Sequence, residues 1–170
     1  GGRAAKLILQ SWMNKYHRFP DFIVLEGSKA GGHLGFKEED LLSGETPSLA
    51  SLLKDVLENI RPFVDAAKRN IPVFCAGGVW DQNDIQSLTE QGAAGVQMAT
   101  RFIATEECDA SQAYKDVLLG ANREDVSIIH SPVGMPGRAV HTPLLKRLVD
   151  AGRIPPSHCS RCIKKCNPAQ

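Results

Sequence analysis

Three short apolar segments, each followed by a polar turn and then by helical periodicity, constrain the fold more than any other feature of the sequence. They span residues 22–25, 71–76 and 95–98. Short continuous apolar runs are typical of strands that are covered on both faces, as in parallel sheets. The alternation therefore predicts an α/β fold built on a parallel sheet. Because three strands cannot close a barrel and a doubly wound sheet usually has more, we expect part of a larger α/β domain.

Helical periodicity precedes and separates these segments. Apolar side chains recur at helical spacing over residues 3–16, which predicts a first helix. A second helix is expected over residues 49–60, where apolar residues trace one face. Thr46 and Pro47 are expected to open this helix as its cap and its first-turn proline.

Further elements follow towards the end of the chain. Asp81 is expected to cap a third helix that Gly92 ends, and another helix is expected from about residue 105 to 119. Residues 126–130 form a further extended segment in this interpretation. Residues 151–170 are basic, contain no acidic side chain and lack periodicity, so we interpret them as a tail.

The composition is that of an ordinary globular domain, with 42% hydrophobic and 23% charged residues and a formal net charge of +1. This balance argues against a strongly basic nucleic-acid binder, so we expect no nucleic-acid partner. No apolar run approaches the ~18 residues of a membrane helix, and the first residues do not resemble a signal peptide. We therefore expect no membrane association and a cytoplasmic location. Because the sequence has no initial Met, we expect it to begin within a longer one.

Three of the five cysteines, Cys159, Cys162 and Cys166, crowd into a C-x2-C-x3-C pattern. Thiolates at this spacing can share a zinc ion or an iron–sulfur cluster, although three ligands are one short of a closed site. The alternative is a set of reduced thiols in a tail. We favour that alternative and predict no metal site, while these three cysteines remain the candidate ligands.

The loops after the predicted strands are the candidate ligand site, because parallel α/β folds bind ligands where strands end and helices begin. The loops over residues 26–35 and 76–78 are rich in glycine, and the loop over 98–102 carries the Thr100 hydroxyl. Glycine lets backbone N–H groups approach an anion without a Cβ in the way. The sequence therefore predicts a phosphate site. The alternative is that these glycines only form tight turns.

His33 lies in the first of these loops, between glycines. Imidazole titrates near neutral pH and can accept or donate a proton without a large shift of its pKa. A histidine in a loop is more often a solvated residue, and the other four histidines are interpreted so. The position of His33 at the strand-end face makes it the candidate general base.

Three segments together resemble the nitronate monooxygenase family. They read A-G-G-H-x-G at residues 30–35, I-P-V-x-x-A-G-G at 71–78 and G-V-Q-M-x-T-R-F at 95–102. The segment S-P-V-G-M-P-G-R at 131–138 is similar to one that follows the last barrel strand in this family. The family, formerly called 2-nitropropane dioxygenases, includes flavin-dependent enoyl-acyl carrier protein reductases of the same fold.

The resemblance covers roughly residues 20–140 and implies a (β/α)8 TIM barrel that binds FMN at its C-terminal face. The three predicted strands would be the sixth, seventh and eighth of that barrel, so the N-terminal half would be absent. Residues 1–150 would then be the C-terminal part of a flavin domain, and residues 151–170 a basic, cysteine-containing tail.

The resemblance also implies roles for individual residues. The FMN phosphate would lie between the turn at residues 77–78 and the turn at 98–100, and His33 would reach the substrate over the flavin ring. Ala99 departs from the glycine that is usual in the family, and a left-handed backbone there would be strained. The implied cofactor-binding residues are Gly31, Gly32, Gly77, Gly78, Gln97, Met98, Ala99 and Thr100.

The resemblance implies first that the protein functions as an FMN-dependent monooxygenase, which converts alkyl nitronates and O2 into a carbonyl compound and nitrite. One alternative is an enoyl-acyl carrier protein reductase that uses NAD(P)H and an enoyl thioester. Another is a truncated, non-catalytic flavin-binding fragment, because three parallel strands would leave an open edge and an uncovered barrel interior. Barrels related to inosine monophosphate dehydrogenase would need a catalytic Cys in a loop, whereas Cys75 lies in a predicted strand. The sequence leaves the oligomeric state open.

Overall fold

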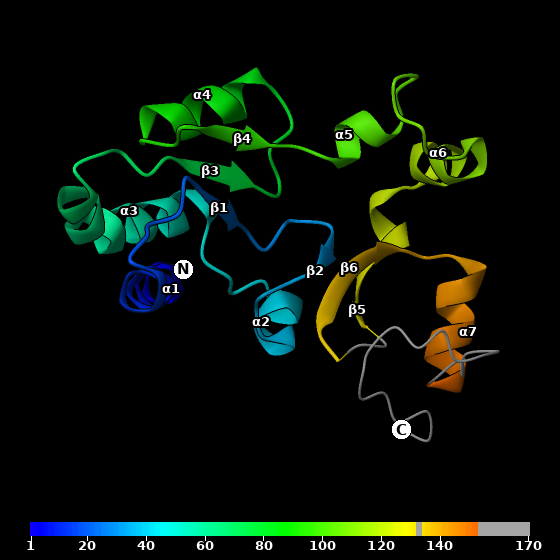
Figure 1. Ribbon diagram of the computed structural model, residues 1–170. Helices are drawn as coiled ribbons and strands as arrows, with labels where there is room; N and C mark the ends of the chain where they lie inside the picture. Colours follow the sequence, from blue (N-terminus) through cyan, green and yellow to red (C-terminus); the bar gives the residue numbers. More distant parts are fainter. Residues whose placement is uncertain (132–133, 153–170) are drawn as a thin grey trace. The chain divides into compact units, whose positions relative to one another are not determined.

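The computed structural model describes residues 1–131 and 134–152 (Figure 1). The chain divides into two compact units, one over Gly1–Val140 and a second that begins at His141. No helix of the described residues is long and apolar enough to cross a membrane. The second unit contributes α7 (Pro143–Ala151), whose first turn is capped by Thr142 through a hydrogen bond from the N–H of Leu145.

The first unit contains a parallel sheet of three strands, β1 (Ile23–Glu26), β3 (Val73–Ala76) and β4 (Gly95–Gln97). Their order is β1-β3-β4, and both pairings are parallel (Figure 1). The prediction of a parallel sheet from three apolar segments is thus confirmed. β3 and β4 are two residues and one residue shorter than the apolar runs that predicted them, whereas β1 has the expected length and begins one residue later.

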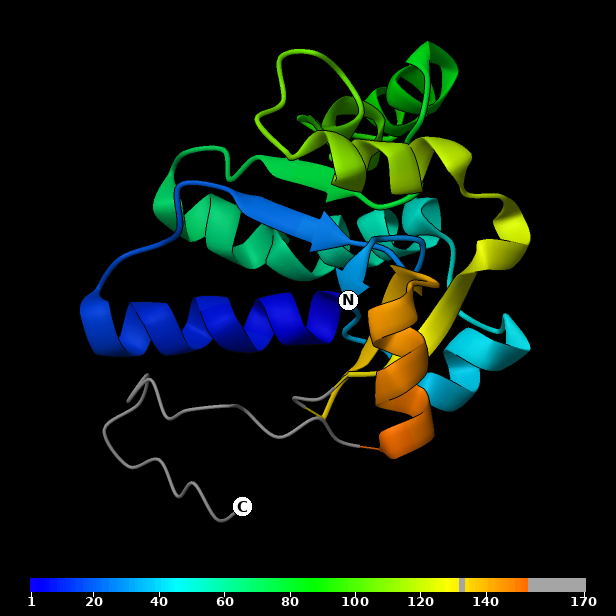
Figure 2. The same cartoon turned by 90° about the vertical axis from the view of Figure 1, so that its right-hand side faces the viewer.

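Helices α1 (Gly2–Tyr16), α3 (Leu49–Ala67) and α4 (Gln82–Glu90) supply the apolar side chains that cover one face of this sheet. Figure 2 shows α1 and α3 side by side, and the N–H of Gly2 donates to the carboxylate of Asp55 at 2.6 Å. Burial of such apolar surface is the main stabilising contribution to a fold of this kind. Within this core, the most deeply buried side chains are Leu9, Leu53, Val56, Ile60, Ile71, Val73 and Cys75.

The other face of the sheet is uncovered in the described part of the chain. Phe22 is 55% exposed and Val24 is 41% exposed, whereas Leu25, on the opposite face, is buried. Together with Phe74, the two exposed residues line a hollow of about 640 Å³. The apolar runs had suggested strands covered on both faces, and here only one face is covered.

A second, antiparallel sheet follows the order β2-β6-β5 and consists of β2 (Gly32–His33), β6 (Pro136–Val140) and β5 (Val126–His130). Only β5 had been predicted. A two-residue strand that begins with glycine has no apolar pattern of its own, so its pairing is decided by the tertiary structure.

The start of α3 corrects one sequence prediction. Ser48, rather than Thr46, caps the helix, and its hydroxyl accepts a hydrogen bond from the N–H of Ser51. The Thr46 hydroxyl instead donates to Ser28 Oγ at 2.7 Å. Pro47 therefore precedes the cap and is not a first-turn residue. The cap at Asp81 is confirmed: its side chain accepts hydrogen bonds from two N–H groups of the first turn of α4.

The helix that was expected over residues 105–119 begins later than predicted. The short helix α5 (Thr100–Ile103) follows β4 directly, and α6 (Gln112–Gly120) then begins after its cap, Ser111. A 3-10 turn, η1 (Arg123–Asp125), leads into β5. The Ser111 hydroxyl accepts from the N–H of Tyr114, so a local capping interaction sets the start of α6.

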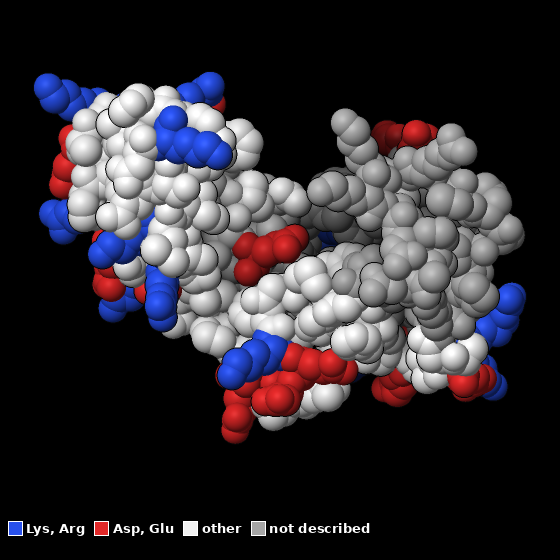
Figure 3. Space-filling view, turned by 60° about the horizontal axis from the view of Figure 1, so that its bottom comes forward, with Lys and Arg blue, Asp and Glu red and all other residues white. Residues whose placement is uncertain are grey.

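The short helix α2 (Glu38–Ser43) was not predicted. Its first turn holds Glu38, Glu39 and Asp40, which form the acidic group that Figure 3 shows with a basic side chain beside it. Carboxylates at a helix N-terminus interact favourably with the helix dipole. Glu38 also lies 3.4 Å from Nδ1 of His130, which ties α2 to the end of β5.

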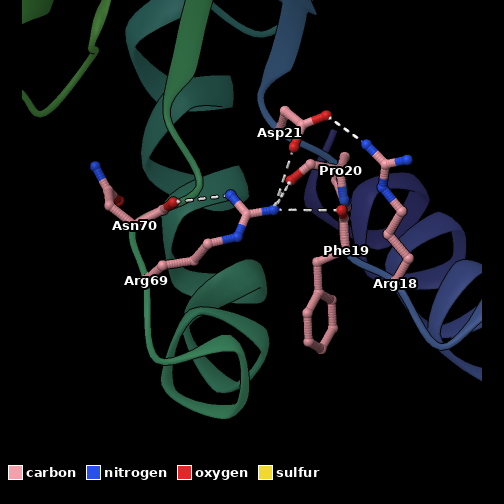
Figure 4. A network of polar contacts seen from close by, with 6 residues as sticks. All are labelled: Arg18, Phe19, Pro20, Asp21, Arg69 and Asn70. Atoms are coloured by element: carbon pink, nitrogen blue, oxygen red, sulfur yellow. Dashed lines mark hydrogen bonds and ion pairs between the residues drawn. The ribbon is translucent and has the colours of Figure 1, made fainter.

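Arg69 joins the segments that lead into β1 and β3 (Figure 4). Its Nη2 donates to the backbone oxygens of Pro20 at 2.9 Å and Phe19 at 3.3 Å, and it lies 3.7 Å from Asp21. These contacts lie where the parallel strands begin. The glycine-rich loops leave from the opposite edge of the sheet.

Candidate functional site

The three loops singled out by the sequence leave from one edge of the parallel sheet. The register aligns the last residues of the strands, Glu26 with Ala76 and Ala76 with Gln97. Beyond the strands, the N–H of Gly27 donates to the backbone oxygen of Ala76 at 2.9 Å. The alignment brings the loops after β1, β3 and β4 to the same edge, where parallel α/β folds bind their ligands.

The turn after β3 requires glycine at two consecutive positions. Gly77 has φ +89° and Gly78 has φ +83°, a region that favours glycine strongly. A Cβ on Gly77 would lie 2.7 Å from the backbone nitrogen of Ala30, and one on Gly78 would lie 2.9 Å from Cβ of Lys29. The loops after β1 and β3 are therefore packed directly against each other. This packing explains both glycines without a ligand.

The backbone donors of these loops carry the case for an anion site. Among the described residues, no hydrogen bond is donated by the N–H groups of Gly77, Gly78, Met98 or Ala99. Backbone donors that are not used within the protein are suited to bind a phosphate group. The four N–H groups belong to the two turns between which the resemblance puts the FMN phosphate.

The N-terminus of α4 is less suited to an anion, because most of its backbone donors are used within the protein. The N–H groups of Asn83 and Asp84 donate to Asp81, and those of Trp80 and Asp81 donate to the carboxylate of Asp84. Two carboxylates at this helix end accept from these four donors and repel a further anion. The turn at Gly77 and Gly78, rather than the helix that follows it, is thus the candidate.

The segment after β4 holds Ala99 at a negative φ. Ala99 has φ −125° and ψ −62°, so the strained left-handed conformation considered for this residue does not occur. Thr100 follows as the first residue of α5. Arg101 Nη1 donates to the backbone oxygen of Trp80 at 2.7 Å, and its guanidinium lies 5.2 Å from the centre of the Trp80 ring. Arg101 thus links the segments that follow β3 and β4.

Two different hollows contain these candidate residues. Gly77 and Gly78 border a cavity of about 380 Å³, together with the loop after β1 and the start of α3. Gln97 and Met98 line the hollow on the uncovered face of the sheet. The two pairs of residues lie at the same edge of the sheet, but neither of these two hollows is lined by both pairs.

Gly31 and Gly32 lie in the loop that leads into β2, and Gly32 has φ +73°. A Cβ on either residue would meet no atom within 4 Å. Space therefore remains beside this loop for a flat group to approach the backbone. In the register of the second sheet, Gly32 pairs with Arg138 and His33 pairs with Gly137.

The His33 side chain forms a hydrogen bond that joins two distant parts of the sequence. Its Nε2 lies 2.7 Å from Oγ of Ser131, a buried residue 98 positions away. The backbone of Ser131 is fixed by a turn, since its N–H donates to Met135 and its oxygen accepts from the N–H of Gly134. The segment that contains Ser131 had been noted only as part of a resemblance, so sequence reasoning missed this contact.

Arg138 is a second residue that sequence reasoning missed. Its Nη2 donates to the backbone oxygen of Ser28 at 3.0 Å, which joins β6 to the loop after β1. Its Nε is buried and has no hydrogen-bond partner among the described residues. The sequence signal that could have identified Arg138 is its charge, because the other residues of the segment 136–140 are apolar or small.

The cysteines give no metal centre in the described part of the chain. Cys159, Cys162 and Cys166 lie outside the described residues, and no group of three or more potential ligands occurs within them. Cys75 is buried in β3, where burial raises the pKa of its thiol. A buried thiol with a raised pKa is a poor nucleophile.

Comparison with known proteins gives the family. The sequence profile of nitronate monooxygenases matches residues 3–164. The chain belongs to the nitronate monooxygenase family. It is 31% identical over 128 residues to a probable nitronate monooxygenase of Staphylococcus saprophyticus; the match covers 75% of the chain and 34% of that protein. The chain thus spans about a third of the length of this curated relative.

Solved structures of related proteins have the same fold. A nitroalkane oxidase from Streptomyces ansochromogenes matches with a TM-score of 0.63 at 26% identity, over 86% of this chain and 38% of that one. FabK from Thermotoga maritima matches with a TM-score of 0.63 at 25% identity, over 88% and 40% of the two chains. The predicted fold class is therefore confirmed as part of a (β/α)8 barrel. Members of the nitronate monooxygenase family are flavin-dependent oxidoreductases.

Proposed function

We propose that this chain contributes the FMN phosphate site and the proton-accepting residue of an enzyme that oxidises alkyl nitronates with O2 to a carbonyl compound and nitrite. The observation that carries the proposal is the position of His33. It lies in a glycine-bordered loop after β1, and Ser131 holds its ring. Its loop leaves the sheet at the same edge as the unused backbone donors after β3 and β4.

The residues present fit FMN. The proposed phosphate donors are the N–H groups of Gly77, Gly78 and Ala99, with the hydroxyl of Thr100 beside them. These N–H groups have no acceptor among the described residues, and they lie in the turns that follow two neighbouring strands, β3 and β4. The open space beside Gly31 and Gly32 suits a planar ring. Gln97 and Met98 lie at the end of β4 and complete the proposed set.

FMN, when bound, supplies the electron transfer and the reaction with O2. The protein positions the substrate and moves its proton. A nitronate arrives already deprotonated, whereas a neutral nitroalkane must first lose its α-proton to a base. We assign this step to His33, whose ring nitrogen takes the proton from carbon.

A second candidate is an NAD(P)H-dependent enoyl reductase. It is favoured by the similarity to FabK, which has the same TM-score as the nitroalkane oxidase. In that reaction His33 would orient or protonate an enoyl thioester. A third candidate, a flavin-binding chain without activity, is favoured by the uncovered face of the sheet.

The test uses the flavin-loaded protein without oxygen, mixed either with an alkyl nitronate or with NAD(P)H, while the flavin absorbance is followed. Bleaching by the nitronate alone supports the proposal, and bleaching by NAD(P)H alone supports the reductase. Failure of both reagents to bleach a bound flavin supports the inactive chain. If the protein does not bind FMN at all, the phosphate site built on Gly77, Gly78 and Thr100 is wrong.

The role of His33 has its own test. His33→Ala should lower kcat/KM for a neutral nitroalkane by about 10²–10⁴-fold, the usual contribution of a general base. The same variant should lower kcat/KM for the corresponding nitronate far less. Equal losses for the two substrates would contradict a role in proton removal.

A further inference from the structure

We infer that Ser131 is a positioning residue that holds His33 in the Nε2–H tautomer, so that Nδ1 is the nitrogen that accepts the substrate proton. The inference deepens the proposed function and rests on it for the identity of the substrate. The hydrogen bond on which the inference is based is independent of the proposed function: Nε2 of His33 lies 2.7 Å from Oγ of Ser131.

The chemistry of a neutral imidazole allows two arrangements of this hydrogen bond. One ring nitrogen carries a proton and the other carries a lone pair. If Ser131 donates to Nε2, then Nδ1 carries the proton, and neither nitrogen has a lone pair left for the substrate. If Nε2–H donates to Oγ of Ser131, Nδ1 keeps its lone pair. Only the second arrangement leaves His33 able to act as a base without breaking the bond to Ser131.

The surroundings of the other ring nitrogen agree with this assignment. The side chain of His33 is exposed, and within the described part of the chain its hydrogen bond runs through Nε2 to Ser131. Nδ1 is therefore the nitrogen available to a substrate. After proton uptake both nitrogens carry N–H groups, and Nε2–H still donates to the same hydroxyl. The ring accepts the proton without reorienting its partner.

The second sheet fixes both ends of this contact. The backbone of His33 pairs with Gly137 of β6, and the N–H of Leu34 donates to Pro136 at 2.9 Å. Ser131 follows β5, which pairs with the same strand β6, and it is only 7% exposed. One hairpin therefore carries the backbone partner of His33 and its side-chain partner. A mobile surface serine could not set the tautomer in this way, because its hydroxyl would exchange freely with water.

The decisive measurement is a nitrogen NMR spectrum of the flavin-loaded protein with ¹⁵N-labelled histidine, with His33→Gln used to assign the signals. In the neutral form, the inference expects an unprotonated Nδ1 and a protonated Nε2. Ser131→Ala should give a mixture of both tautomers, and Ser131→Thr, which keeps the hydroxyl, should retain the original one. A protonated Nδ1 in the unaltered protein would overturn the inference, as would an unchanged tautomer in Ser131→Ala.

A kinetic comparison tests the consequence. Ser131→Ala should lower the ratio of kcat/KM for a neutral nitroalkane to kcat/KM for its nitronate by about 10–100-fold, because a misplaced catalytic group can cost up to about 10²-fold in rate. Ser51→Ala, which removes an exposed hydroxyl on α3, is the matched control and should keep the ratio within about twofold. An unchanged ratio in Ser131→Ala would contradict the inference.

The two possible failures are distinguishable. If the unaltered protein oxidises neither substrate, the proposed function is wrong, and the tautomer measurement alone decides the role of Ser131. If it oxidises both and Ser131→Ala leaves the ratio and the tautomer unchanged, the function stands and the inference fails.

Discussion

Replacing Gly77 by Ala tests the packing of the two loops at the candidate site. Two costs add at this residue. A non-glycine residue at φ +89° costs about 1–2 kcal/mol. The new Cβ would also lie 2.7 Å from the backbone nitrogen of Ala30 and 2.9 Å from its Cβ, so the loop must move. Overpacking of this kind costs typically about 1–3 kcal/mol. We expect Gly77→Ala to lower the free energy of unfolding by about 2–5 kcal/mol.

Gly44 provides a matched control. It has φ +76°, but a Cβ there would meet no atom within 4 Å. Gly44→Ala therefore has the backbone cost of about 1–2 kcal/mol without the clash. Urea unfolding of the unaltered protein and both variants gives the three free energies. Equal destabilisation by the two substitutions would refute the reasoning, because the close approach of the loops would then contribute nothing.

Three further predictions concern other parts of the chain. Arg69→Ala removes the hydrogen bonds to Phe19 and Pro20 and should lower the free energy of unfolding by about 1 kcal/mol, whereas Arg61→Ala, on the exposed face of α3, should leave it nearly unchanged. Because burial raises the pKa of Cys75, the thiol of the unfolded chain loses its proton first as the pH rises above about 8.5. The free energy of unfolding should therefore fall as the pH rises, and it should fall less steeply in Cys75→Val. Urea unfolding between about pH 8 and about pH 10 measures both slopes. Arg101→Ala removes the hydrogen bond and ring contact to Trp80 and should weaken FMN binding by about tenfold in a fluorescence titration, and unchanged affinity would exclude Arg101 from organising the site.

A local signal in the sequence was enough to predict the start of α4. The cap at Asp81 could be predicted because its partners are two and three residues away. The start of α3 could not be predicted in the same way. Thr46 looks like a cap, but its hydroxyl bonds to Ser28 in another loop, and Ser48 takes the capping role. The Thr46 hydroxyl is engaged in a tertiary contact that the sequence around it does not indicate.

The same limit applies to the candidate site. His33 could be singled out because the glycines around it are neighbours in the sequence. Its partner Ser131 is 98 residues away and lies in a turn that has no catalytic pattern of its own. The antiparallel pairing of β2 with β6 brings the two together, and a two-residue strand carries no readable periodicity. The sequence therefore indicated the candidate base but not the group that orients it.

The uncovered face of the parallel sheet explains why the strands read as continuous apolar runs, although only one face is buried here. Along this face the residues change from apolar to polar towards the loops. Val24 pairs with Phe74, whereas Glu26 and Gln97 end their strands. Phe74 also fills the space beside Gly95, where a Cβ would lie 3.0 Å from its ring. Such a face suits the interior of a barrel, which is packed with side chains and carries its chemistry at the carboxyl ends of the strands. The polarity of this face therefore points to the same sheet edge as the glycine loops and His33.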